Sequence, residues 1–160
     1  MSAVPGDFIR VHTRPARPLL VPEVTLLVAD DVVALWEALE QGLVDPGSDP
    51  PFWAAAWPGG QALARYVLDH PEVVAGRTVL DLGAGSGLVA VAAARAGAAA
   101  VVASEVDPYG RTAIAVNAEE NGVGPITVVG DLLDGEPDPG VDVVLAGDVC
   151  YDRVMSEHVL

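Results

Sequence analysis

Acidic residues recur in this sequence wherever a short apolar segment ends. Asp81 lies in the segment 78–82, Glu105 ends the segment 100–105, Asp131 follows the segment 126–129 and Asp148 follows the segment 141–146. If these segments are parallel strands, their carboxyl ends meet at one edge of a sheet, where open α/β sheets bind ligands. Carboxylates at that edge can accept hydrogen bonds from hydroxyl and amino groups and attract cations. The pattern predicts one polar site assembled from several strand ends.

A glycine-rich turn follows the first of these segments. Gly83, Gly85 and Gly87 can be read in two registers. Residues 85–90 fit the dinucleotide fingerprint, with alanine in the last place. Residues 83–87 preceded by Asp81 instead fit the pattern of an S-adenosylmethionine (SAM) site.

The charge of Asp81 distinguishes these two cofactors. A dinucleotide would place its anionic pyrophosphate at the turn and the helix N-terminus. Two unit charges about 4 Å apart interact by about 4 kcal/mol at an effective dielectric constant of about 20, so Asp81 would repel that group. SAM carries a sulfonium and an ammonium group, and glycines let the backbone approach its amino-acid moiety. The sequence therefore favours SAM, with S-adenosylhomocysteine (SAH) as the product.

Two further acids are candidates for the nucleoside half of the cofactor. Glu105 ends the second strand and can accept both ribose hydroxyls, in either cofactor class. Asp131 can accept a hydrogen bond from the adenine amino group, but it can equally be a turn residue in an Asp- and Gly-rich loop. Asp107 precedes Pro108, which predicts a helix N-cap rather than a ligand.

The elements that must position these residues alternate between strand and helix from residue 78 onward. We expect helices near 86–96 and 108–121, and a further helix over 152–160. This alternation predicts an α/β fold, a three-layer sandwich with a mostly parallel sheet covered on both faces.

We divide the chain into an N-terminal accessory segment, 1–50, and a core, 51–160. In the accessory segment we expect extended or irregular chain over 10–18, a strand over 24–28 and a helix over 31–41 capped by Asp30. A helix beginning near Gln61 should end at His70-Pro71.

Composition limits the possible partners of the chain. The 160 residues include 23 acidic and eight basic ones, all of them arginine, for a net charge of −15. Such a surface repels phosphate backbones, so we expect no nucleic-acid partner. The single cysteine and three scattered histidines argue against a metal site. We also expect no membrane span and no signal peptide, hence a cytoplasmic protein of undetermined oligomeric state.

Several segments in order resemble one family, the seven-β-strand (class I, Rossmann-like) SAM-dependent protein lysine methyltransferases. The resemblance is strongest to the electron transfer flavoprotein β-subunit lysine methyltransferase group and covers roughly residues 5–160. It rests on Pro51–Leu63, with its Trp57-Pro58-Gly59-Gly60 motif, on Val79–Gly87, Ser104–Pro108, the helix carrying Asn117 and Asn121, and Gly147–Asp152. The glycine turn is typical of the whole superfamily, whereas the Trp-Pro-Gly-Gly and Asp-x-x-Tyr motifs are much more specific in combination.

The resemblance implies roles for residues outside the glycine turn. The Asp-x-x-Tyr motif, Asp148 and Tyr151, would lie beside the methyl group and position an acceptor lysine, and Trp57 would wall the cofactor pocket. Trp57 can also be read as a core residue. Open alternatives are a small-molecule amine as acceptor, a SAM-binding module without catalysis, and a nicotinamide-dinucleotide domain. The chain supplies four of the seven strands of this class and lacks the C-terminal ones, so the fourth strand should form an exposed apolar edge.

Overall fold

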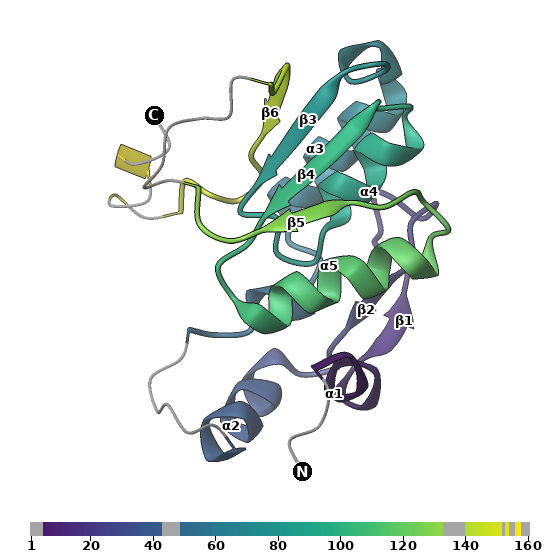
Figure 1. Ribbon diagram of the computed structural model, residues 1–160. Helices are drawn as coiled ribbons and strands as arrows, with labels where there is room; N and C mark the ends of the chain where they lie inside the picture. The colour runs from purple at the N-terminus through teal and green to yellow at the C-terminus, as the bar shows by residue number, and fades with distance from the viewer. Residues whose placement is uncertain (1–4, 43–48, 133–139, 152, 154–155, 158–160) are drawn as a thin grey trace.

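A four-stranded parallel sheet lies at the centre of the molecule. The computed structural model describes residues 5–42, 49–132, 140–151, 153 and 156–157. The strands are β3 (Thr78–Leu82), β4 (Ala100–Ser104), β5 (Thr127–Val129) and β6 (Val143–Leu145), in the order β5-β4-β3-β6 (Figure 1). All three pairings are parallel, which confirms the predicted α/β fold with its crossover connections.

Three helices pack on one face of this sheet. They are α3 (Pro58–Asp69), α4 (Leu88–Arg95) and α5 (Pro108–Glu120), and Figure 1 shows α3 and α4 behind the strands. Helix α3 begins before the predicted Gln61 because Pro58 is preorganised for the first helical turn. It ends at His70-Pro71, as predicted. On the covered face, Val79 of β3 and Val91 of α4 are completely buried in the main core.

The opposite face of the sheet is open in the part of the chain that the structure describes. Leu80 pairs in register with Val102 on one side and with Val144 on the other. Leu80 and Val102 are half-buried and Val144 is 58% exposed. The described helices thus supply one of the two covering layers that the sandwich prediction requires, and β6 lies at an edge of the described sheet.

The N-terminal segment begins with a helix that the sequence analysis did not predict. Residues 10–18, expected to be extended or irregular, begin with the helical end of α1 (Pro5–His12), which differs from the expectation, and then form the extended strand β1 (Arg14–Ala16), which agrees with it. The helix forms because Ile9 is completely buried against α5 in a second core cluster. Strand β1 pairs antiparallel with β2 (Leu26–Val28).

Helix α2 (Val32–Gly42) is capped by a different acid from the one predicted. The Asp31 carboxylate accepts hydrogen bonds from the N–H groups of Val33 (2.9 Å) and Ala34 (3.0 Å). Asp30 instead pairs with Arg14 at the start of β1. An acid one residue further from the helix cannot reach its first-turn N–H groups. The short 3₁₀ helices Phe52–Ala54 and Pro71–Val73 flank α3.

Two further expectations concern a membrane-spanning helix and a helix near the end of the sequence. No helix in the described ranges is long and apolar enough to cross a membrane. Most of the helix expected over 152–160 lies outside the described residues. The described residues in this range, 153, 156 and 157, are helical.

Candidate cofactor and acceptor site

The ends of the parallel strands meet at one edge of the sheet, as the acid pattern predicts. Leu82 lies beside Ser104, Ser104 beside Val129, and Asp81 beside Leu145. The Ser104 hydroxyl donates to the carbonyl of Gly130 (2.8 Å), which holds the ends of β4 and β5 together. The segments that follow these strands therefore surround a common edge.

The glycine turn between β3 and α4 has the left-handed backbone that glycine tolerates best. Gly83, Gly85 and Gly87 have φ angles of 64°, 53° and 79°. A β-carbon on Gly87 would lie 3.3 Å from the Ile114 backbone, and one on Gly83 would lie 2.7 Å from the Val149 side chain. A β-carbon on Gly85 would meet nothing within 4 Å. Two glycines thus allow close packing of the protein, and the third leaves open space above the turn.

Asp81 lies under this turn and is almost completely buried. Its carboxylate accepts a hydrogen bond from the Ala90 N–H, in the first turn of α4 (2.8 Å). Burial raises the pKa of Asp81 from 3.8 to about 7, the Ala90 hydrogen bond opposes that rise, and the Glu105 charge adds to it. A nearby cation stabilises the ionised form of such a buried acid and lowers its pKa toward the ordinary value.

Glu105 reaches back from the end of β4 to the glycine turn. Its two carboxylate oxygens accept from the N–H groups of Gly85 (2.8 Å) and Asp107 (2.9 Å). Burial raises the pKa of Glu105, and these hydrogen bonds to its charged form oppose the rise. A β-carbon on Gly110 would lie 2.7 Å from the Glu105 side chain, so a glycine in α5 makes room for this acid. The structure brings Asp81, Gly85 and Glu105 together, as predicted from their strand ends.

The remaining acids of the cofactor half differ in placement. Asp107 caps α5 by accepting from the Tyr109 N–H (2.7 Å), as predicted. Asp131 is exposed and follows Gly130 at the end of β5. Its role toward an adenine amino group stays a prediction.

Asp148 lies at the N-terminus of α3, an arrangement that the sequence did not suggest. Its two carboxylate oxygens accept from the N–H groups of Gly59 (3.0 Å) and Gly60. Asp148 also has a φ angle of 57°, the only positive value at a non-glycine residue in the described chain. Such a backbone is costly outside glycine, although aspartate tolerates it better than most residues. The contact with the helix N-terminus stabilises both the conformation and the charge.

Gly59 of the Trp-Pro-Gly-Gly motif and Gly147, which precedes Asp148, make this contact possible. A β-carbon on Gly59 would lie 2.5 Å from an Asp148 carboxylate oxygen. A β-carbon on Gly147 would lie 3.0 Å from the Gly60 Cα. The motif before α3 and the motif after β6 are therefore one structural unit. The glycine doublet was the available signal for this close approach.

Three aromatic rings lie beside that unit at the molecular surface. Phe52 lies between Trp57 and Tyr151, with ring centroids 5.9 Å and 6.1 Å away respectively. The Trp57 ring is 41% exposed, and its N–H donates to the Phe52 carbonyl (2.7 Å). Tyr151 is 67% exposed. The structure groups Trp57 with the predicted acceptor residue Tyr151, and sequence reasoning had given Phe52 no role.

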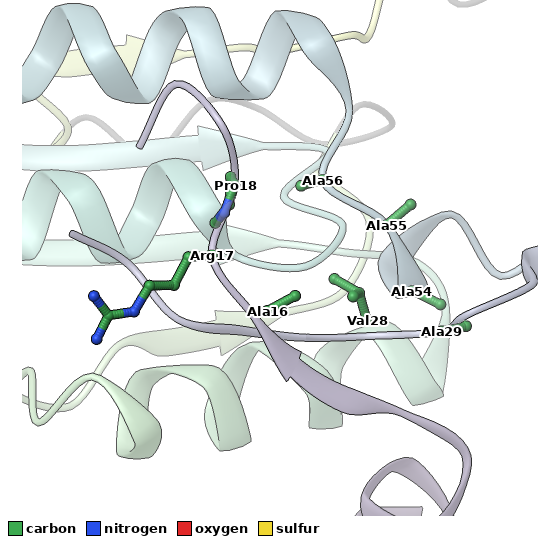
Figure 2. A pocket seen from close by; sticks show the side chains of 8 residues that line it. All are labelled: Ala16, Arg17, Pro18, Val28, Ala29, Ala54, Ala55 and Ala56. Atoms are coloured by element: carbon green, nitrogen blue, oxygen red, sulfur yellow. The ribbon is translucent and has the colours of Figure 1, made fainter. Parts of the chain in front are cut away.

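A cavity of about 190 Å³ lies between the β1–β2 hairpin and the chain that leads into this aromatic group. Figure 2 shows the small side chains that line it and Arg17, which points away from the alanines. Its lining consists of Ala16, Arg17, Pro18, Val28, Ala29 and Ala54–Ala56. None of the predicted cofactor or acceptor residues lines it, so it is separate from the strand-end site. No cluster of three or more His, Cys, Asp or Glu side chains suited to a metal occurs in the described part of the chain.

The fold and the glycine turn with its buried acids define the class of Rossmann-like SAM-dependent methyltransferases. Solved structures with the same fold include Arabidopsis thaliana protein arginine methyltransferase 10 (28% identity, TM-score 0.52, covering 61% of this chain and 29% of that one). A Pyrococcus abyssi tRNA (uracil-54, C5)-methyltransferase in complex with S-adenosyl-L-homocysteine shares the fold at 20% identity (TM-score 0.54, covering 83% of this chain and 27% of that one).

Within this class, the chain belongs to the family described as ribosomal protein L11 methyltransferase (PrmA), whose model matches residues 61–149. Similar curated proteins are the electron transfer flavoprotein beta subunit lysine methyltransferases of Danio rerio and Homo sapiens. The first is 44% identical over 86% of this chain and 52% of its own length, and the second is 41% identical over 88% and 52%. The chain therefore spans about half the length of these relatives.

The residues at the strand ends fit the cofactor of this class. Each oxygen of the Glu105 carboxylate has accepted one hydrogen bond, which leaves capacity for ribose hydroxyls. The free space above Gly85 allows a ligand to approach the backbone. The ionisable Asp81 below the turn favours a cationic ligand over an anionic one.

Proposed function

We propose that this chain is a SAM-dependent protein lysine N-methyltransferase and that its substrate is the β subunit of an electron transfer flavoprotein. The observation that carries the proposal is the joining of the two halves of the site at the end of the sheet. Gly83 of the glycine turn packs against Val149, the residue next to Asp148. The names of the curated relatives support lysine as the acceptor.

On the cofactor side, this chain's own groups bind and orient. Glu105 accepts the ribose hydroxyls, the glycine turn receives the amino-acid moiety, and Asp81 provides the negative charge below it. In this proposal, Asp131 accepts a hydrogen bond from the adenine amino group. Bound SAM supplies an electrophilic methyl group on a sulfonium.

On the acceptor side, the exposed aromatic rings and Asp148 receive the amine. The exposed rings of Phe52 and Tyr151 contact the alkylammonium chain, which favours a lysine side chain over a neutral group, and Trp57, next to Phe52, walls the cofactor pocket. The Asp148 carboxylate is held by two helix N–H groups and keeps acceptor capacity for the amine. These residues align the nitrogen for an in-line displacement, in which the new N–C bond forms as the S–C bond breaks.

The acceptor amine must lose a proton before it reacts. Free lysine has a pKa of about 10.4, and Asp148 alone would favour its charged form. Desolvation of the bound amine and the nearby sulfonium charge lower the amine pKa, so that the proton can leave to water. Asp148 is a positioning group in this proposal and not a general base.

The direct test is methyl transfer from radiolabelled SAM to purified electron transfer flavoprotein, followed by mass spectrometry of the β subunit. We expect label on lysine and none on a β subunit whose lysines have been blocked by acetylation. Label on a free small amine but not on the protein would favour small-molecule methylation. SAH binding by calorimetry without label on any acceptor would identify a binding module.

We also propose that the protein acts in the cytoplasm. The single, exposed Cys150 is compatible with a reducing compartment. Cell fractionation with an antibody against the chain tests this, and recovery with the membrane fraction would contradict it.

A further inference from the structure

Asn117 in α5 connects the N-terminal hairpin to the glycine turn through a completely buried side chain. We define the hairpin as residues 14–28, which include β1 and β2. The Asn117 amide oxygen accepts from the Leu27 N–H (2.9 Å), and its amide nitrogen donates to the Ser86 carbonyl (2.8 Å). The exposed fraction of Asn117 is zero. A buried amide with both ends satisfied fixes both of its partners, because breaking either contact leaves a buried polar group without a partner.

The Ser86 carbonyl belongs to the part of the turn that must hold its shape around a ligand. Ser86 is buried and lies between Gly85, whose N–H donates to Glu105, and Gly87, which packs on Ile114. Ile114 and Asn117 are neighbours on one face of α5. Helix α5 thus packs beneath the turn, and Asn117 makes a hydrogen bond from this helix to the turn.

A second asparagine on the same helix provides an internal comparison. Asn121 lies one helical turn after Asn117 and binds the same hairpin, accepting from the Thr25 N–H (2.9 Å) and donating to the Thr25 carbonyl (2.7 Å). Its other hydrogen bond goes to the Asn117 carbonyl, within α5. Both asparagines therefore dock the hairpin, but of the two only Asn117 has a hydrogen bond to the turn among the contacts of the described residues.

We propose that Asn117 is a positioning residue of the cofactor site, which couples docking of the N-terminal hairpin to the shape of the glycine turn. The inference rests on the proposed function, because the ligand of the turn is the cofactor. It assigns the N-terminal segment a part in cofactor affinity. The residue that follows the hairpin also contacts the acceptor side, since the Ala29 N–H donates to the carbonyl of Ala54, which lies between Phe52 and Trp57 in the sequence (2.9 Å).

The test compares Asn117→Ala with the matched Asn121→Ala. Calorimetry with SAH measures cofactor affinity, and urea unfolding confirms that each variant is folded at the temperature used. We expect both variants to lose stability, because Asn117→Ala gives up two buried hydrogen bonds and Asn121→Ala gives up three partly buried ones. We expect Asn117→Ala to bind SAH at least about tenfold more weakly, as for the loss of one buried hydrogen bond, and Asn121→Ala to stay within about threefold.

A second measurement uses the unchanged protein, so it does not depend on the folding of a variant. Coupling is reciprocal, so SAH binding must in turn stabilise the docked hairpin. Amide hydrogen exchange by NMR should slow at Leu27, which donates to Asn117, more than at Thr25, which donates to Asn121.

The outcomes separate this inference from the proposed function. Equal loss of SAH affinity in the two variants, or equal exchange rates at Leu27 with and without SAH, would overturn the coupling and leave the cofactor assignment intact. Failure of the unchanged protein to bind SAH would overturn the proposed function, and the inference with it.

Discussion

Asp81 and Asp148 occupy equivalent places in two parts of the site but are used in opposite ways. Asp81 is the second-last residue of β3 and Asp148 follows β6, and each accepts from the first turn of a neighbouring helix, α4 for Asp81 and α3 for Asp148. Asp81 is 2% exposed, and burial raises its pKa. Asp148 is exposed and has a left-handed backbone instead.

The difference shows how one residue type can serve two functions in one fold. A buried carboxylate is costly without a partner, so its free energy depends on whether a cation is bound. The charge of an exposed carboxylate is screened by water, so such a group contributes mainly by holding its hydrogen-bond partners in a fixed geometry. The cofactor half of the site is therefore sensitive to charge, and the acceptor half is sensitive to position.

The largest expected effect concerns Asp81→Asn, which removes the buried charge and keeps an acceptor for the Ala90 N–H. The folded protein holds the Asp81 proton with a pKa of about 7, compared with 3.8 ordinarily. Ionisation therefore opposes folding: stability falls as pH rises from 3.8 to 7, and the full cost is present above pH 7. A shift of this size corresponds to about 4 kcal/mol at most, so the variant should unfold at higher urea at pH 8 and show no gain at pH 4.

The same variant should bind SAM more weakly. In the unchanged protein, affinity for this cation should increase as pH rises from 6 toward 7.5, because Asp81 ionises in that interval. Calorimetry across this range should show the increase, and Asp81→Asn should flatten it. A variant that keeps the full pH dependence would show that Asp81 does not sense the cofactor.

Asp148→Ala should affect turnover and leave cofactor binding nearly intact. Loss of the positioned carboxylate should lower kcat/KM for the protein acceptor by about 100-fold, as misplacement of reacting groups does. SAH affinity should change by less than about threefold, equivalent to under 1 kcal/mol.

A matched control for Asp148 lies at the opposite end of the sheet. The Asp142 carboxylate also accepts from a backbone N–H, that of Thr78 at the start of β3 (2.8 Å). Asp142→Ala therefore removes a similar hydrogen bond far from the strand-end site. If both variants lost activity equally in methyl-transfer assays, the effect of Asp148 would be one of stability alone.

The glycine turn allows packing and ligand approach to be separated. Gly87→Ala introduces a β-carbon near the Ile114 backbone in a left-handed conformation, which should cost about 2–3 kcal/mol of stability. Gly85→Ala meets open space and should cost only about 1–2 kcal/mol of backbone strain.

The two glycine variants should rank differently in their loss of SAH affinity than in their loss of stability. A β-carbon on Gly85 would occupy the space that the ligand uses, so this variant should lose SAH affinity out of proportion to its change in urea midpoint. Equal losses of affinity and stability in both variants would argue against a ligand above Gly85.

The smallest effect is expected for Tyr151→Phe, which keeps the ring beside Phe52 and removes the hydroxyl. Methyl transfer should fall by about tenfold or less, the value of one exposed hydrogen bond. Tyr151→Ala should fall further because the ring contact with Phe52 is lost as well. Identical rates for the two variants would mean that the ring itself contributes nothing to acceptor binding.

Local patterns predicted most of the sheet and its helices. The strands of the core, the Asp107 cap and the end of α3 at His70 all follow from apolar runs and from the conformational limits of proline. The errors lie where tertiary contact overrides local signals. Residues 10–12 were expected to be extended or irregular, but burial of Ile9 against α5 makes them the end of a helix.

The sequence by itself determined the order of elements, the positions that need glycine and the acids at the strand ends, because these depend on short-range periodicity and backbone sterics. The tertiary structure decided which partner each acid takes. Asp148 meets Gly59 across 89 residues and Asn117 meets Leu27 across 90. Such contacts depend on how helices pack over the sheet, which no local pattern specifies. Packing thus left the strand-end carboxylate of Asp81 buried and charge-sensitive, and that of Asp148 exposed on a helix N-terminus.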